Sequence, residues 1–167
     1  QLWKHAAKKE IRLYGLEKEI QYFQGISHPH IVKPLSFIKL TRVGMILELG
    51  KRDLLEHIIG NYAYRVQWVE QLLSAVSYLH DKGIVHRDIK PENVIICNKV
   101  IKLVDLDHAQ SLKDRSENHS VIIGTVGNCP PEAYLAKDSV EHVKNNPNRS
   151  PWRKCVKAQD IWSLGVT

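Results

Sequence analysis

The residues with the clearest chemical potential lie at positions 86–93, which read His-Arg-Asp-Ile-Lys-Pro-Glu-Asn. Asp88, Lys90 and Asn93 stand close together there, between a predicted helix and a predicted strand. A carboxylate can orient a hydroxyl and accept its proton, an ammonium group can neutralise phosphate charge, and an amide oxygen can coordinate Mg²⁺. The three side chains are therefore suited to phosphoryl transfer.

A second carboxylate, Asp105, comes twelve residues after Asn93 and directly after an apolar run. Oxygen ligands of this kind hold hard cations such as Mg²⁺. Asn93 and Asp105 are therefore the candidate metal ligands. The nine histidines and three cysteines, by contrast, show neither zinc-ligand spacing nor a disulfide pattern.

Apolar spacing predicts the elements that must position these residues. Helical periodicity marks residues 11–23 and 66–79, and Gly83 is suited to end the second helix in a left-handed conformation. Runs rich in β-branched residues predict strands at residues 31–32, 43–47, 94–97 and 100–104. The last two strands flank Asn98 and Lys99, which predicts a tight turn.

The composition is that of an ordinary globular protein, with 43% hydrophobic and 25% charged residues among 167. No apolar run is long enough to predict a membrane segment. The sequence lacks an initial Met, and its last residues stop inside an apolar pattern. We therefore interpret it as a piece of a larger domain. The few, scattered cysteines indicate reduced thiols and a cytoplasmic or nuclear protein.

The net charge of +6 is uneven. Residues 137–157 hold six basic and two acidic side chains, which gives 6 − 2 = +4. We interpret this stretch as a solvated basic insert that could bind an acidic partner. A nucleic acid partner is not favoured.

Positions 86–93 and Asp105 resemble the catalytic loop and metal-binding motif of the eukaryotic-type protein kinase family. Residues 124–132 are similar to the end of its activation segment, and residues 160–165 to the start of its central large-lobe helix. The resemblance implies an α+β, two-lobed fold that is incomplete at both ends, with ATP between the lobes. Residues 1–49 would belong to the small lobe and residues 50–167 to the first half of the large lobe.

The resemblance also implies a role for each matched residue. Asp88 would be the catalytic base, Lys90 would contact the γ-phosphate, and Asn93 and Asp105 would hold Mg²⁺. Lys90 together with Thr125 is similar to the Ser/Thr-specific branch. The residues expected around ATP are Lys4, Glu19, Leu47, Glu48, Leu49, Asp53 and Ile95.

Regulation is expected at Arg87 and at Ser120, because a phosphate on the activation segment would pair with the Arg beside the catalytic Asp. The expected activity is transfer of the γ-phosphoryl of Mg·ATP to a Ser or Thr of a protein. Two alternatives stay open: a pseudokinase that serves as a scaffold, and a kinase of small molecules.

Two departures from the family pattern bear on activity. Asp105-Leu106-Asp107 replaces Asp-Phe-Gly, and Pro130-Pro131-Glu132 replaces Ala-Pro-Glu. Glycine frees the backbone for a positive φ, so Asp107 is expected to be strained. Its carboxylate could also be a further metal ligand, although we favour a tolerated substitution.

Overall fold

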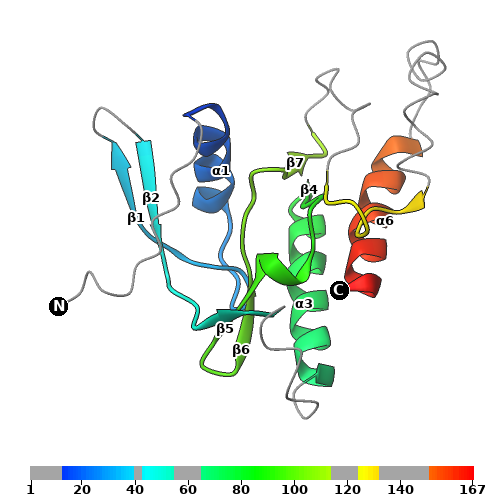
Figure 1. Cartoon of the computed structure of the whole chain (residues 1–167). Coiled ribbons are helices and arrows are strands. Elements are labelled where there is room, and N and C mark those ends of the chain that lie inside the picture. The colour runs from blue at the N-terminus through cyan, green and yellow to red at the C-terminus, as the bar shows by residue number, and fades with distance from the viewer. Residues whose placement is uncertain (1–12, 40–42, 55–64, 114–123, 132–150) are drawn as a thin grey trace. The chain divides into compact units, whose positions relative to one another are not determined.

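The computed structural model describes residues 13–39, 43–54, 65–113, 124–131 and 151–167 (Figure 1). The chain forms two compact units, which it enters alternately. The first unit holds Gln1–Tyr78 and Pro91–Asp107, and the second holds Leu79–Lys90 and His108–Thr167. The mixed α+β fold class is confirmed, whereas the predicted division of the chain at residues 49 and 50 stays a prediction.

The first unit contains a two-stranded hairpin and a three-stranded sheet. In the hairpin, β1 (Pro34–Lys39) pairs antiparallel with β2 (Val43–Leu47), and α1 (Leu13–Gly25) contacts β2. Residues 31–32 were expected to form a strand, but Ile31 makes only one bridge to Leu103. The strand β1 begins later, at Pro34, and a proline is tolerated at this first position of a strand.

The three-stranded sheet has the order β3 (Arg52–Asp53), β5 (Val94–Cys97), β6 (Val100–Leu103). Asn98 and Lys99 join β5 to β6 with φ values of 50° and 69°. Two successive positive φ values match the right-handed twist of a hairpin, so the predicted turn and both strands are confirmed. Alternate side chains of β5 and β6 are buried.

Helix α3 (Arg65–Asp81) spans the predicted amphipathic segment. Its buried apolar residues recur three or four positions apart, at Trp68, Leu72, Ala75, Val76 and Leu79. The Trp68 indole N–H donates to the Lys99 carbonyl at 3.1 Å, and the Gln71 side chain accepts from the Ile101 N–H at 2.9 Å. These two bonds attach α3 to the β5–β6 hairpin.

The second unit is built around the chain that leaves α3. Gly83 has a φ of 73° and its N–H donates to the His80 carbonyl, which confirms the predicted left-handed cap. The strand β4 (Ile84–Val85) pairs antiparallel with β7 (Gln110–Ser111). The short 3₁₀ helix η3 (Pro91–Asn93) then returns the chain to the first unit.

The second unit ends with α6 (Pro151–Val166), which contacts β4. A proline suits the first position of a helix, because its fixed φ is helical and its missing N–H is not needed there. The last part of the expected basic insert, residues 151–157, is therefore helical, while residues 137–150 lie outside the described residues. Among the helices of the described ranges, none could cross a membrane.

Candidate active site

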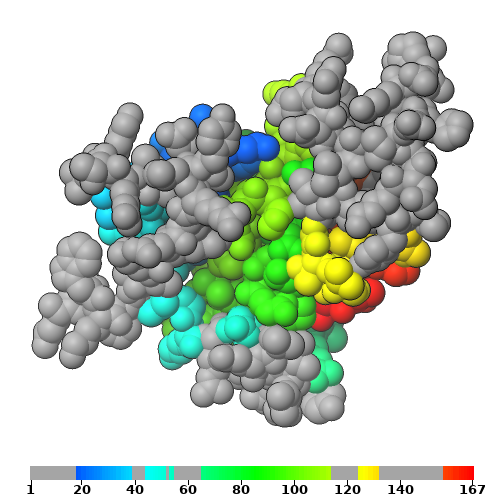
Figure 2. All heavy atoms as spheres, turned by 45° about the horizontal axis from the view of Figure 1, so that its top comes forward, coloured from blue at the N-terminus to red at the C-terminus, as the bar shows by residue number. Residues whose placement is uncertain are grey.

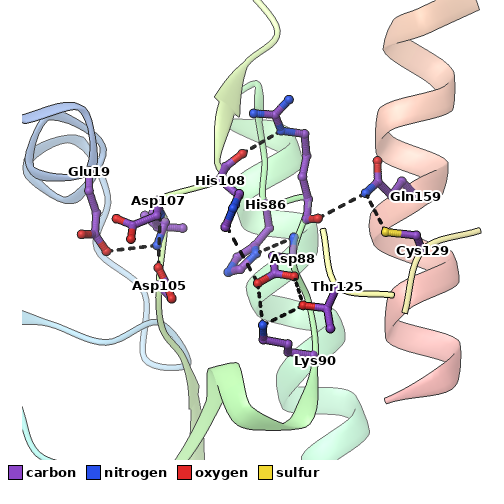
Figure 3. A network of polar contacts seen from close by, with 12 residues as sticks. Glu19, His86, Asp88, Lys90, Asp105, Asp107, His108, Thr125, Cys129 and Gln159 are labelled. Atoms are coloured by element: carbon purple, nitrogen blue, oxygen red, sulfur yellow. Dashed lines mark hydrogen bonds and ion pairs between the residues drawn. The ribbon is translucent and has the colours of Figure 1, made fainter. Parts of the chain in front are cut away.

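The second unit brings together three of the predicted catalytic residues (Figure 3). The Thr125 hydroxyl donates to Asp88 Oδ1 at 2.7 Å. Lys90 Nζ lies 2.9 Å from Asp88 Oδ2 and donates to Thr125 Oγ1 at 2.7 Å. The closed triangle fixes the carboxylate, which is only 5% exposed, between a hydroxyl and an ammonium group.

The triangle also sets the charge state of Asp88. Burial raises the pKa of the Asp88 carboxyl, but hydrogen bonds from Thr125 and Lys90, the positive charge of Lys90 and a smaller electrostatic contribution from His108 lower it more. The net result is a pKa below its ordinary value. A buried carboxylate that stays ionised can accept a hydrogen bond from a hydroxyl and remains available as a proton acceptor.

The backbone of the loop is held by Asp160, a fully buried residue of α6. Asp160 Oδ2 accepts from the His86 N–H at 2.9 Å, and Oδ1 accepts from the Arg87 N–H at 2.7 Å. His80 Nε2 lies 2.7 Å from Asp160 Oδ2. Sequence reasoning identified Asp160 only as part of a helical motif and missed His80, since neither partner is near in sequence. The sequence signal that could have identified Asp160 is an acidic residue among the apolar residues of a helix.

Arg87, the predicted regulatory residue, adopts a left-handed conformation with a φ of 68°. Its Nε–H donates to the His108 carbonyl at 2.6 Å, and its own carbonyl accepts from Gln159 Nε2 at 3.2 Å. Left-handed backbone outside glycine costs about 1–3 kcal/mol and persists where surrounding contacts enforce it. These bonds supply that enforcement beside Asp88. Ser120 lies outside the described residues.

Gly124 is the position that lets Thr125 reach Asp88. Its φ is 133°, and a Cβ atom there would lie 2.7 Å from both the Arg87 carbonyl oxygen and Cys129 Sγ. Both the backbone conformation and the close approach therefore require glycine. The segment 124–131 continues to the surface of its unit (Figure 2, yellow), where Val126 is exposed.

His108 is a further neighbour of Asp88 that sequence reasoning did not identify. Its Nδ1 lies 3.9 Å from Asp88 Oδ2, and its side chain is 48% exposed. It belongs to no motif recognised in the sequence, so only the fold reveals this proximity.

The first unit contains a separate acidic cluster, formed by Glu19, Asp105 and Asp107. One ligand atom from each residue lies within 4.8 Å of the others (Figure 3). Glu19 is buried on α1, and its Oε1 accepts from the Leu106 N–H at 3.1 Å. Three carboxylates with oxygen donors fit a hard divalent cation.

The strain expected at Asp107 lies instead at Asp105, so that expectation is wrong. Asp105 has a φ of 67°, whereas Asp107 is absent from the described residues with positive φ. The Asp107 N–H donates to Asp105 Oδ1 at 3.3 Å. A short polar side chain tolerates the left-handed region comparatively well, so the turn forms without glycine at position 107.

Asn93 also belongs to the first unit. It is buried at the end of η3, and its carbonyl accepts from the Val104 N–H at 2.9 Å. This bond ties Asn93 to the chain that runs from β6 into Asp105. Both predicted metal ligands are therefore attached to the same hairpin.

Four of the predicted ATP-binding residues, Leu47, Glu48, Leu49 and Asp53, lie at the end of β2 and in the chain that follows it. Glu19 lies on α1 and Ile95 on β5, while Lys4 is outside the described residues. Leu47 ends β2, Leu49 is exposed, and Asp53 on β3 pairs with Ile95 on β5. A Cβ atom on Gly50 would lie 2.6 Å from Ile95 Cβ. Only glycine lets the chain rest this closely on Ile95.

Comparison with known families agrees with these features. The family described as the protein kinase domain matches residues 2–167.

This chain belongs to the protein kinase family.

Curated relatives include three protein kinases. The kinase domain is 30% identical over 162 residues to a serine/threonine-protein kinase, dkf-2, of Caenorhabditis briggsae, covering 90% of this chain and 12% of the relative. It is 34% identical over 158 residues to developmentally-regulated protein kinase 1 of Dictyostelium discoideum, covering 90% and 20%. It is 29% identical over 170 residues to an Aurora kinase of Eremothecium gossypii, covering 95% and 42%. The chain thus spans less than half the length of each of these relatives.

Proposed function

We propose that this kinase domain transfers the γ-phosphoryl group of Mg·ATP to a Ser or Thr hydroxyl of a protein. The observation that carries the proposal is the triangle of Asp88, Lys90 and Thr125. Membership of the family supports kinase chemistry in general, and the triangle supports an intact catalytic loop.

Each residue of the triangle has a distinct part in the proposed reaction. The Asp88 carboxylate orients the acceptor hydroxyl and takes its proton as the new oxygen–phosphorus bond forms. The bond between the γ-phosphorus and the bridging oxygen breaks, and ADP leaves with the electron pair. Lys90 neutralises negative charge on the transferred group, while the Thr125 hydroxyl keeps Lys90 and Asp88 in register.

The metal-binding role is proposed for Asn93 and Asp105 of the first unit. The oxygen-rich cluster around Asp105 supports a hard cation there. When bound, Mg²⁺ would neutralise phosphate charge. Glu19, Leu47, Glu48, Leu49, Asp53 and Ile95 are proposed to bind the nucleotide, together with Lys4.

Specificity for Ser and Thr rests on two observations. Lys90 and Thr125 contact each other, as expected from the resemblance to the Ser/Thr-specific branch. One of the relatives described above is also named a serine/threonine-protein kinase. A cytoplasmic or nuclear location and an acidic partner for residues 137–157 remain predictions from composition alone.

The replacement of glycine by Asp107 favours a second candidate, a pseudokinase that binds nucleotide without transfer. The deciding experiment measures labelled phosphate transfer from Mg·ATP to generic Ser/Thr protein substrates, using the full chain that carries this domain. Asp88→Asn should lower transfer by about 10²–10⁴-fold. Asp81→Asn, the same change at an exposed position, is the matched control.

The two candidates give different results. Transfer by the natural sequence that disappears in Asp88→Asn and survives in Asp81→Asn would support the kinase. Absence of transfer, with Mg·ATP still raising the melting temperature, would support the pseudokinase.

A further inference from the structure

Glu48 receives two donors from different parts of the first unit. Its Oε1 accepts from the Lys33 backbone N–H at 2.7 Å and from Lys102 Nζ at 2.6 Å. The side chains of Lys102 and Glu48 are 17% and 26% exposed. The pair is thus largely withdrawn from water, where a charge-assisted hydrogen bond is stronger than at an open surface.

The bond connects the segment after β2 with the three-stranded sheet. Lys102 lies on β6, directly opposite Ile95 of β5. Three residues after Glu48, the Lys51 N–H donates to the Ile96 carbonyl at 2.9 Å. The short stretch between Glu48 and Lys51 is therefore anchored at each end to the β5–β6 hairpin.

Only Leu49 and Gly50 lie between these anchors. Leu49 is exposed, and Gly50 rests against Ile95 closely enough to exclude a side chain of its own. A stretch of two residues held at both ends has few conformations, so its backbone groups keep fixed directions. Leu49 in this stretch, and Glu48 at its start, are among the residues to which the proposed function assigns nucleotide binding.

We propose that Lys102 is a positioning residue for nucleotide binding, which acts through Glu48 to hold residues 48–50 in their binding conformation. The inference rests on the proposed function. Without the ion pair, the stretch would adopt the binding conformation for a smaller fraction of the time. Apparent affinity falls in proportion to that fraction.

The test measures binding of Mg·ATP and phosphate transfer in the full chain. Lys102→Gln should raise the Kd and KM for ATP about 3- to 10-fold, within the range of couplings between contacting residues, and leave kcat within about twofold. Lys102→Arg, which keeps the charge, should restore most of the affinity. Substitution of a catalytic residue would instead lower kcat.

A matched control is available at Lys33. Its contact with Glu48 comes from the backbone N–H, and its side chain is exposed. Lys33→Gln removes one positive charge, as Lys102→Gln does, but keeps the backbone contact. It should therefore bind ATP like the natural sequence. An equal loss of ATP affinity in Lys33→Gln and Lys102→Gln would overturn the inference and indicate a general charge effect.

A double-mutant cycle distinguishes the effect of the Glu48–Lys102 ion pair from the separate effects of the two residues. Glu48→Gln keeps an oxygen for the Lys33 N–H but loses the charge, so combining it with Lys102→Gln should add little to the single losses. The inference would be overturned if the losses of ATP affinity in the two single variants added up in the double variant. It would also be overturned if Lys102→Gln left ATP affinity unchanged while the natural sequence still bound ATP. Failure of the natural sequence to bind Mg·ATP would overturn the proposed function itself.

Discussion

Asp88 and Asp105 are the same residue type in opposite surroundings. Asp88 is enclosed by the Thr125 hydroxyl, the Lys90 ammonium and the His108 imidazole. Asp105 instead faces the carboxylates of Glu19 and Asp107. The second unit thus balances its functional charge with its own side chains, whereas the acidic cluster of the first unit concentrates negative charge.

The difference indicates which part of the chemistry depends on a bound ion. Unit charges about 4 Å apart interact by about 1 kcal/mol in water and several-fold more near a protein surface. A divalent cation would turn the repulsion within the acidic cluster into attraction. The Asp88 triangle has its charges paired already, so its geometry should be independent of metal.

Among the further changes that test this contrast, the largest effect is expected at Asp105. Asp105→Asn removes charge from the proposed metal site, so transfer should fall by about 10²–10³-fold, equivalent to several kcal/mol of lost electrostatic stabilisation. Binding of ATP should also lose its dependence on Mg²⁺. In Asp88→Asn, by contrast, that dependence should persist.

Titration of ATP affinity against Mg²⁺ separates the two variants. Glu70→Gln, an exposed carboxylate on α3 of the same unit, is the control for loss of charge. Equal Mg²⁺ dependence in Asp105→Asn and the natural sequence would contradict a metal-binding role for Asp105.

The next effect concerns the support of the catalytic loop. Asp160→Asn keeps the size of the side chain but leaves one acceptor oxygen for two buried backbone donors, His86 and Arg87. An orphaned buried donor costs about 1–3 kcal/mol, and the free energy of unfolding should fall accordingly. The urea midpoint of the full chain measures this change.

The exposed Asp81→Asn again serves as the comparison, since it makes the same chemical change at the end of α3. An Asp160→Asn variant with unaltered stability and unaltered transfer would show that the loop does not need this acceptor.

A smaller effect is expected at Asp107, the third carboxylate of the acidic cluster. Its carboxylate lies within 4.8 Å of Asp105 and Glu19, so Asp107→Asn should weaken the apparent affinity for Mg²⁺ by about 3- to 10-fold, in line with loss of one partly screened charge interaction. The Mg²⁺ concentration needed for half-maximal transfer measures it. An unchanged requirement would favour a tolerated substitution at this position.

The smallest effect is a change in pH dependence. The Thr125 hydroxyl helps to lower the pKa of Asp88, so Thr125→Val should raise that pKa and move the acid limb of kcat/KM to higher pH. Lys90 still supports the ionised carboxylate, which limits the shift. Thr125→Ser keeps the hydroxyl and should leave the acid limb in place.

The lowered pKa of Asp88 also means that this residue stabilises the folded state at neutral pH. Asp88 contributes stability at pH values above its pKa in the unfolded chain, about 3.9, and this contribution is lost as the pH falls through the lower folded-state value. Thr125→Val should reduce that contribution at neutral pH. An acid limb that does not move would mean that the hydroxyl leaves the charge on Asp88 unaffected.

Sequence reasoning performed best where chemistry and local structure coincide. The β5–β6 hairpin, the helix α3 and its glycine cap follow from short-range apolar spacing and turn residues, and all three are confirmed. The resemblance to the kinase family assigned Asp88, Lys90 and Thr125 to the catalytic site. The structure brings their side chains into contact although Thr125 is distant in sequence.

Contacts without a local pattern were not predictable. His80 and His108 reach their partners only through the packing of distant segments, and no spacing rule marks them. The strained residue was misplaced at Asp107 because sequence comparison indicates which residue departs from a pattern, not which backbone torsion changes. The start of α6 at Pro151 was missed because residues 137–157 were interpreted together as one basic surface insert.

The bonds from Asp160 to the catalytic loop join residues 73 and 74 positions apart. During translation the catalytic loop is synthesised well before α6. Closing so long a stretch of chain also has an entropic cost. A nascent chain that ends before residue 160 cannot satisfy the His86 and Arg87 donors in this way. We therefore expect the order of synthesis to delay catalytic competence, so that the loop becomes ordered only when α6 has formed and docked.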